Sequence, residues 1–253
     1  LMKYEPYDYQ KYATNFIEEK QASAVFLSMG LGKTVITLSA LFDLLFDSFD
    51  VHKVLVIAPL RVAKFTWPSE IEKWEHLSFL KYSVVVGTEV QRKKALDEKA
   101  DIYIINRENV QWLIDKSGYK FDYDMIVIDE LSSFKNGKSV RFKSLLKVRP
   151  LAKRIVGLTG TPSGNGLMDL WAEFKLLDYG VRLERFITHY RNKYFIPDKR
   201  NGEIVYSYKL IPGADKVIYH KISDITMSMK AEDYLKMPKL IYRNHEVDLP
   251  DNA

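Results

Sequence analysis

The chain has 253 residues, of which 47% are hydrophobic and 28% are charged, with a formal net charge of +5. This composition is typical of a globular protein and excludes disordered and collagen-like chains. The absence of cysteine excludes disulfides, thiolate zinc sites and cysteine nucleophiles. The small positive charge permits a polyanionic partner such as a nucleic acid without requiring one.

The sequence contains no membrane-spanning pattern. No stretch reaches the roughly 18 uncharged apolar residues that cross a bilayer, and the first residues lack the apolar region of a signal peptide. We therefore expect a soluble, intracellular protein in the cytoplasm, with no membrane partner.

The first 162 residues alternate between short β-branched runs and amphipathic segments. This alternation predicts an α/β fold, in which a parallel sheet carries helices on both faces. The expected strands are 24–28, 54–58, 83–86, 102–105, 125–128 and 155–158. The expected helices are 8–19, 34–46, 89–98, 139–147 and 167–177.

The pattern changes after Pro162. A helix is expected around Trp171, a second at 182–194, and a turn at 198–202 between extended segments. Residues 163–253 are too few for a second α/β lobe of typical domain size. We therefore predict one α/β domain at 1–162 and a mixed helical region at 163–253, which is an incomplete region or an insertion.

A glycine-rich turn, Gly30-Leu31-Gly32-Lys33-Thr34, lies between an expected strand and an expected helix. In this context backbone N–H groups and the helix N-terminus can bind phosphates. Lys33 is expected to neutralise the β and γ phosphates, and Thr34 to hold Mg²⁺. The strict pattern has a glycine where this chain has Leu27, and the alternative is a tight turn with a solvated lysine.

Two carboxylates, Asp129 and Glu130, follow the expected strand 125–128. They lie at the edge of an α/β sheet where ligands bind. Asp129 could complete the Mg²⁺ shell, and Glu130 could orient and deprotonate an attacking water. The alternative is a strand that simply ends in charged solvent.

The turn after strand 155–158 contains Thr159, Gly160 and Thr161. Its hydroxyls are expected to face the same edge as Asp129, where they could sense the γ-phosphate and couple it to the rest of the protein. The alternative is a simple Thr-Gly turn.

Together these elements resemble the first motor lobe of superfamily-two helicases, and within them most closely the Swi/Snf-type DNA translocases. Met29 to Thr34 resembles motif I, Asp129-Glu130 with Lys135-Asn136 resembles motif II, and Leu158 to Pro162 resembles motif III. Ala58-Pro59 with Trp67 and Trp74 resembles motif Ia, and Tyr9-Gln10 resembles the adenine-reading element.

The resemblance implies a RecA-like lobe, a three-layer P-loop fold that binds ATP and Mg²⁺ and moves along duplex DNA. It implies that the nucleotide contacts Gln10, Met29, Gly30, Leu31, Gly32, Lys33 and Thr34. It also implies backbone contacts to nucleic acid from Arg61 and Lys64 after motif Ia and from Asn106 and Arg107. A further basic cluster comprises Arg141, Lys143, Lys147 and Arg149, although such clusters are more often solvated faces.

Three departures from the family pattern stand out. Leu131-Ser132 replaces the usual Ala-His after the acidic pair, and Leu27-Ser28 stands where acidic residues usually precede motif I. The second lobe is missing, because motif VI needs a Gln beyond motif III and the last one is Gln111. The chain alone is therefore expected to bind ATP but hydrolyse it poorly, with a second lobe supplied beyond Ala253 or by a partner.

Other interpretations remain open. The motor could belong to an RNA helicase or to a restriction-type translocase of the same superfamily. The chain could instead be a non-hydrolysing DNA-binding scaffold, although such a scaffold would need neither Lys33 nor the Asp129-Glu130 pair.

Overall fold

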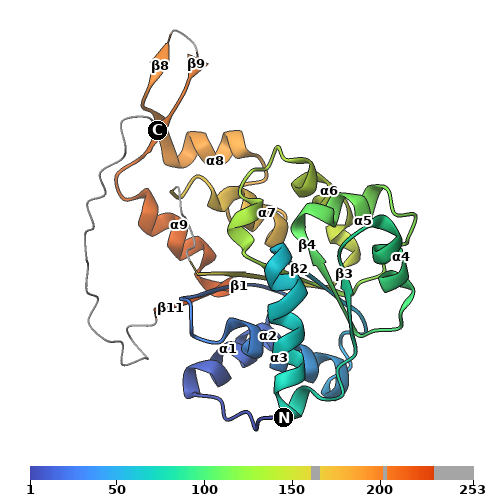
Figure 1. The fold of residues 1–253 in the computed structure, drawn as a ribbon. Helices are drawn as coiled ribbons and strands as arrows, with labels where there is room; N and C mark the ends of the chain where they lie inside the picture. The colour runs from blue at the N-terminus through green and yellow to red at the C-terminus, as the bar shows by residue number, and fades with distance from the viewer. Residues whose placement is uncertain (161–165, 202–203, 231–253) are drawn as a thin grey trace, which may run out of the picture.

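The computed structural model describes residues 1–160, 166–201 and 204–230. They contain a seven-stranded parallel sheet that lies between two layers of helices (Figure 1). The strand order is β11-β1-β6-β5-β2-β4-β3. The strands are β1 (Ala22–Leu27), β2 (Val54–Ala58), β3 (Tyr82–Val85), β4 (Ile102–Asn106), β5 (Met125–Asp129), β6 (Arg154–Thr159) and β11 (Thr226–Met229). The expected α/β fold is confirmed.

The central strands are buried on both faces. Every residue of β2 and β4 is buried, because each strand has helices above and below it. The sequences of strands that are buried on both faces are continuous apolar runs, without the alternation of apolar and polar residues seen in half-buried strands. The six strands expected from such runs are all present; 54–58 matches β2 at both ends, and no end of the others differs by more than two residues.

The seventh strand, β11, was not expected. It pairs in parallel with β1, with Ala24 opposite Thr226 and Leu27 opposite Met229. As an edge strand it is only partly buried, so its sequence Thr-Met-Ser-Met has no continuous apolar run. The division of the chain at residue 162 stays a prediction, but the sheet includes a strand from beyond that point.

Helices cover both faces of the sheet. One face carries α1 (Asp8–Glu19), α2 (Lys33–Phe42) and α3 (Trp67–Lys73). The opposite face carries α4 (Glu89–Asp97), α5 (Val110–Asp115), α6 (Val140–Val148), α7 (Leu170–Asp178), α8 (Ile187–Tyr194) and α9 (Ala214–Ile222). A π-helical segment, Asp43–Asp47, continues α2, and a second, Val62–Thr66, directly precedes α3.

Three of these helices, α3, α5 and α9, were not predicted, and α8 is shorter than the expected helix 182–194. The backbone of Glu184 has a φ of 73°, in the left-handed region, which is incompatible with a helix through that residue. The helix therefore begins only at Ile187.

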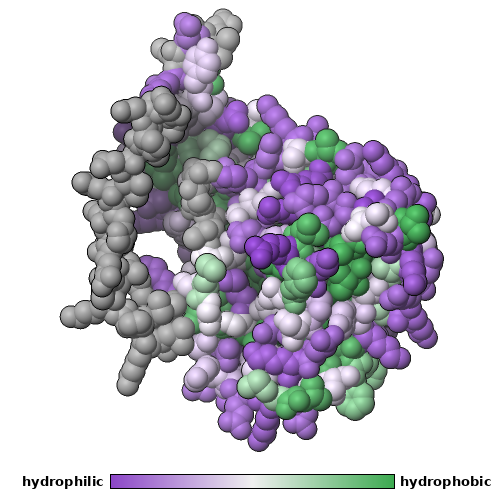
Figure 2. All heavy atoms as spheres, viewed as in Figure 1, coloured by the Kyte–Doolittle hydropathy of each residue, from purple (hydrophilic) through white to green (hydrophobic). Residues whose placement is uncertain are grey.

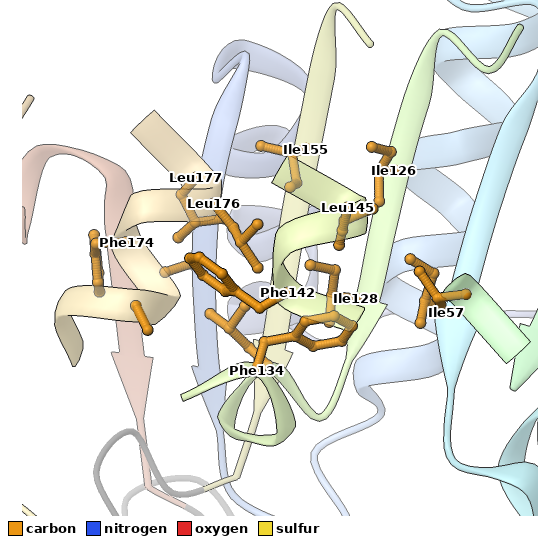
Figure 3. Packing of buried hydrophobic residues seen from close by; sticks show 14 of the residues in the cluster. Ile57, Ile126, Ile128, Phe134, Phe142, Leu145, Ile155, Phe174, Leu176 and Leu177 are labelled. Atoms are coloured by element: carbon orange, nitrogen blue, oxygen red, sulfur yellow. The ribbon is translucent and has the colours of Figure 1, made fainter. Parts of the chain in front are cut away.

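The core between the sheet and the upper helical layer is rich in aromatic and branched side chains (Figure 3). Phe142 of α6 and Phe134 lie beside the isoleucines of β5, and Phe174 belongs to the same core on the far side of α7. This core fixes the segment that follows β5, and with it the position of the acidic pair.

The region after α8 is extended. Strands β7 (Phe195–Pro197) and β10 (Tyr208–Leu210) pair antiparallel, as do β8 (Arg200–Asn201) and β9 (Ile204–Val205). Strands β8 and β9 project from the body as a narrow arm at the top of Figure 1. Of the turn expected at 198–202, Arg200 and Asn201 form strand β8, and Gly202 lies outside the described residues.

The molecular surface shown in Figure 2 is mostly hydrophilic, with small separate apolar patches. Within the described residues no helix is both long and apolar enough to cross a membrane.

Candidate functional site

Three of the predicted motifs meet at one edge of the sheet. Strands β1, β6 and β5 are neighbours, and in their registers Phe26 lies opposite Thr159 and Leu158 lies opposite Asp129. The glycine turn, the acidic pair and the Thr159 turn therefore follow three adjacent strand ends. This is the edge of a parallel α/β sheet at which ligands bind.

An open cavity of ≈ 1180 Å³ lies at this edge. Its volume exceeds that of pockets for drug-sized ligands, roughly 300 to 1,000 Å³, so a nucleoside triphosphate fits within it. The predicted site residues that line it are Gln10, Met29, Gly30, Gly32, Lys33, Thr34, Asp129, Glu130 and Gly160.

The glycine turn has the backbone geometry that requires its glycines. Gly30 and Gly32 have φ values of +86° and +79°, which side-chain-bearing residues rarely adopt. A Cβ on Gly32 would also lie 2.7 Å from Gln10 Nε2. Leu27 stands at the position of the pattern's first glycine, but it is a buried residue of β1, and the turn forms after it.

Lys33 is the first residue of α2 and its ammonium group bends back into the turn. Nζ donates to the carbonyl oxygens of Leu27 at 2.6 Å and Ser28 at 3.4 Å. Burial lowers the pKa of Lys33, and the nearby charges of Asp129 and Glu130 oppose that shift. A partly desolvated cation at the N-terminus of a helix is suited to bind phosphate.

Gln10 is buried and connects the start of α1 to the glycine turn. Its Nε2 donates to the carbonyl oxygen of Leu31 at 3.4 Å, and its Oε1 accepts from the backbone N–H of Tyr7 at 3.0 Å. Leu31 itself is fully buried, so it lies beside the cavity rather than in its lining. Met29, by contrast, is 88% exposed on the turn.

Asp129 ends β5 with its carboxylate largely buried. Its Oδ2 accepts a hydrogen bond from the indole Nε1 of Trp67 at 2.9 Å. Burial raises the pKa of Asp129, while the Trp67 hydrogen bond and the Lys33 charge act in the opposite direction. The resemblance of this region to motif Ia gave no sign of a contact between Trp67 and Asp129, which are 62 positions apart.

Glu130 follows with a φ of 63°, and its side chain connects motifs II and III. Its Oε1 accepts from the hydroxyl of Thr159 at 3.1 Å and also from the hydroxyl of Ser132. The side chain of Leu131 is buried in the core against Gly157. A Cβ added to Gly157 would lie only 2.5 Å from Leu131 Cδ2. In place of the family's Ala-His, this chain therefore has a leucine that packs in the core and a serine whose hydroxyl donates to Glu130.

The donor groups at the cavity suit Mg²⁺. The hydroxyl of Thr34 and the carboxylate of Asp129 both line it, and oxygen ligands are those that Mg²⁺ prefers. The described residues contain no group of three or more His, Cys, Asp or Glu that could enclose a metal.

The predicted coupling turn is only partly described. Thr159 is fully buried, and a Cβ on Gly160 would lie 3.8 Å from Lys33 Nζ, so this turn is beside the lysine. Thr161 lies outside the described residues, so its role stays a prediction.

The four residues predicted to contact nucleic acid lie at or after the ends of two adjacent strands, β2 and β4, whose register pairs Ala58 with Asn106. Arg61 and Lys64 are exposed. Asn106 is buried and donates from Nδ2 to Glu108, whose carboxylate also accepts from Arg107 Nε. A contact between this second pair and nucleic acid stays a prediction.

One member of the additional basic cluster cannot contact nucleic acid. Arg149 is 4% exposed, and its guanidinium donates to the carbonyl oxygens of Ala152, Leu176 and Leu177. Two of these bonds satisfy the carbonyls of Leu176 and Leu177 near the C-terminal end of α7, and the third satisfies Ala152 just before β6. The spacing of charges along the sequence did not reveal this burial.

A profile of the SNF2-related domain matches residues 9–224. Over 261 residues the chain is 35% identical to "Putative protein p41" of Acyrthosiphon pisum secondary endosymbiont phage 1, covering 100% of this chain and 56% of that protein. It is 28% identical over 231 residues to "DNA excision repair protein ERCC-6-like" of Mus musculus, covering 88% and 18% respectively.

The fold is similar to that of the "Sulfolobus solfataricus SWI2/SNF2 ATPase core in complex with dsDNA", with a TM-score of 0.72 at 24% identity. That match covers 93% of this chain and 48% of the other. The chain thus spans about half the length of the phage protein and of the archaeal ATPase core. The chain belongs to the SNF2-related domain family, and it corresponds to the N-terminal RecA-like lobe of such ATPases.

Proposed function

We propose that the chain is the ATP-binding lobe of a DNA-dependent ATPase that couples ATP hydrolysis to movement along duplex DNA. The observation that carries this proposal is the convergence of Lys33, Thr34, Asp129 and Glu130 on one cavity. Membership of the SNF2-related family supports it. The names of the relatives, which include helicases and excision repair proteins, are consistent with it.

Each residue has a distinct role in the proposed site. Lys33 and the N-terminus of α2 bind the phosphates, and Thr34 and Asp129 hold Mg²⁺. The cation, when bound, neutralises charge on the β and γ phosphates. Glu130 orients and deprotonates the attacking water. Gln10 faces the cavity from α1, where it could contact the adenine edge.

The isolated lobe should turn over slowly. Among the described residues no arginine lines the cavity, so none is placed to stabilise the charge that develops during phosphoryl transfer. Loss of such an arginine costs about 10³- to 10⁵-fold in turnover. We propose that a second RecA-like lobe, located beyond Ala253 or supplied by a partner chain, provides it.

A duplex DNA partner is favoured over RNA by the family to which the chain belongs. Contacts of this superfamily to the nucleic-acid backbone carry no sequence information. An RNA helicase lobe or a restriction-type translocase lobe would use the same ATP site. The scaffold alternative is disfavoured, because Lys33 and the acidic pair are not only retained but line one cavity.

The test is the affinity of the chain for Mg-ATP, measured by titration calorimetry for the wild type and for Lys33→Ala. A hydrogen bond to a charged group contributes about 1.5 to 3 kcal/mol, so the variant should bind roughly 10- to 100-fold more weakly. The matched control is Lys138→Ala, which removes an exposed lysine outside the cavity. Equal affinity of all three proteins would overturn the site assignment.

Phosphate release with and without duplex DNA tests the second part of the proposal. We expect slow release that DNA changes little. Strong stimulation by DNA would show that this chain is a complete motor and would contradict the need for a second lobe.

A further inference from the structure

Trp67 connects the segment after β2 to the metal-binding end of β5. It is the first residue of α3 and it directly follows the π-helical segment Val62–Thr66. Its side chain is fully buried, and its indole Nε1 donates to Asp129 Oδ2 at 2.9 Å. The two residues are 62 positions apart in the chain, so this bond is a tertiary contact.

The segment that carries Trp67 has an outer and an inner side. On the outer side Arg61 and Lys64 are exposed, and Phe65 beside them is 60% exposed. On the inner side Val62 and Thr66 line the cavity. A single short segment therefore separates two cations on the surface from the proposed nucleotide site. Single π-helical turns of this kind are frequent at functional sites.

The indole also determines how Asp129 can bind a cation. A buried carboxylate needs donors for its oxygens, and a rigid ring in the core fixes the direction of the bond it makes. Because Oδ2 accepts from Trp67, the direction of the carboxylate at the edge of the cavity is fixed before a metal binds. Groups that hold a metal ligand in this way affect metal affinity about 10- to 100-fold.

We propose that Trp67 is a positioning residue for Asp129, which orients the carboxylate for Mg²⁺ and transmits displacement of the Arg61–Lys64 turn to the metal site. The inference rests on the proposed function in that ATP and a divalent cation must bind at this cavity. Nucleic acid that binds Arg61 and Lys64 and shifts this segment would then change the affinity of the site for the cation. By thermodynamic linkage, the bound cation would change the affinity for nucleic acid by the same factor.

The test measures cation binding rather than hydrolysis. Mn²⁺ is titrated by electron paramagnetic resonance into the full chain with ATP, in the absence and presence of duplex DNA. One variant is Trp67→Phe, and a second carries benzothienylalanine at residue 67, which keeps the shape of the indole and lacks its N–H. The matched control, Trp171→Phe, removes an indole that donates to the carbonyl oxygen of Glu184 instead.

We expect the wild type to bind Mn²⁺ with an affinity that duplex DNA changes by roughly 5-fold or more. Both Trp67 variants should bind it about 10-fold more weakly and should lose the effect of DNA. ATP binding in the presence of a chelator should be equal in all the proteins, as should Mn²⁺ binding by Trp171→Phe and the wild type.

Other outcomes overturn the proposal in distinguishable ways. If only Trp67→Phe is weakened and the benzothienyl variant equals the wild type, the ring acts by packing and the N–H has no positioning role. If DNA leaves Mn²⁺ affinity of the wild type unchanged, the transmission is absent. If the wild type binds neither ATP nor Mn²⁺, the proposed function fails, and the role of Trp67 fails with it.

Discussion

The hydroxyl of Thr159 donates to Oε1 of Glu130 at 3.1 Å, and this bond joins the end of β6 to the residue after β5. Ser132 donates to the same carboxylate oxygen. In the family pattern a histidine follows the acidic pair, whereas here two hydroxyls contact the proposed general base directly. We therefore expect Thr159 to influence the chemical step more than nucleotide binding.

Thr159→Val should lower single-turnover phosphate release about 10-fold and leave Mg-ATP affinity unchanged. The reason is that valine preserves the shape of the buried side chain but removes a hydrogen bond to a charged group, worth about 1.5 to 3 kcal/mol. The control is Thr226→Val in β11, because the hydroxyl of Thr226 is buried with no hydrogen-bond partner among the described residues. A Thr159 variant with the wild-type rate would show that the bond is only structural.

Arg61→Ala and Lys64→Ala should each weaken duplex binding and reduce its salt dependence. Each lost phosphate contact lowers the slope of log affinity against log salt by about 0.9. Fluorescence anisotropy of a labelled duplex between ~50 and ~200 mM salt measures that slope. Lys94→Ala, an exposed lysine on α4, is the control and should leave the slope unchanged. Unaltered slopes in all three variants would remove the turn after β2 from the nucleic-acid surface.

Gly157→Ala should destabilise the fold by about 1 to 3 kcal/mol, because the new methyl group would overpack the buried side chain of Leu131. The loss should be smaller in a chain that also carries Leu131→Ala, which vacates that space. Urea denaturation of the two single variants and the double variant gives the coupling energy. Additive losses would contradict a direct clash between the two positions.

Stability should depend on pH through Glu173, a fully buried residue of α7 whose carboxylate oxygens have no hydrogen-bond partner among the described residues. Burial, assisted by Asp169 and Glu130 and opposed by Lys135, raises the pKa of Glu173 from 4.5 to about 8. The folded protein therefore binds this proton more tightly than the unfolded chain. This contribution is complete below pH 4.5 and is lost as the pH rises through about 8.

Glu173→Gln should remove that dependence. Relative to the wild type, its free energy of unfolding should rise by on the order of 1 kcal/mol per pH unit between these values. Denaturation at several pH values measures the difference, with Glu75→Gln on the surface as the control. Parallel pH profiles for the wild type and Glu173→Gln would show that the carboxyl is ionised at neutral pH.

The sequence predicted the centre of the sheet well, because strands such as β2 and β5 are apolar along most of their length. The sequence also predicted the glycine turn, because the positive φ values of Gly30 and Gly32 favour glycine at these two positions. Both features are encoded locally. The same holds for the Asp129-Glu130 pair at the end of an apolar run.

Tertiary features were not predictable in this way. The indole of Trp67 reaches Asp129 across 62 positions, and Arg149, which looks like part of a basic surface, is buried against α7. Neither contact has a local sequence signal. The edge strand β11 was missed because partial burial leaves polar residues in it.

The position of β11 also has a consequence for any shortened version of this chain. Its backbone pairs with the side of β1 that β6 leaves open, and β1 is the strand that leads into the glycine turn. A fragment that stopped where the sequence pattern changes, near residue 162, would expose the N–H and C=O groups of β1 as an unprotected sheet edge. Such edges recruit strands from other molecules. The strand that covers this side of β1 therefore lies more than sixty positions after the Thr159 turn.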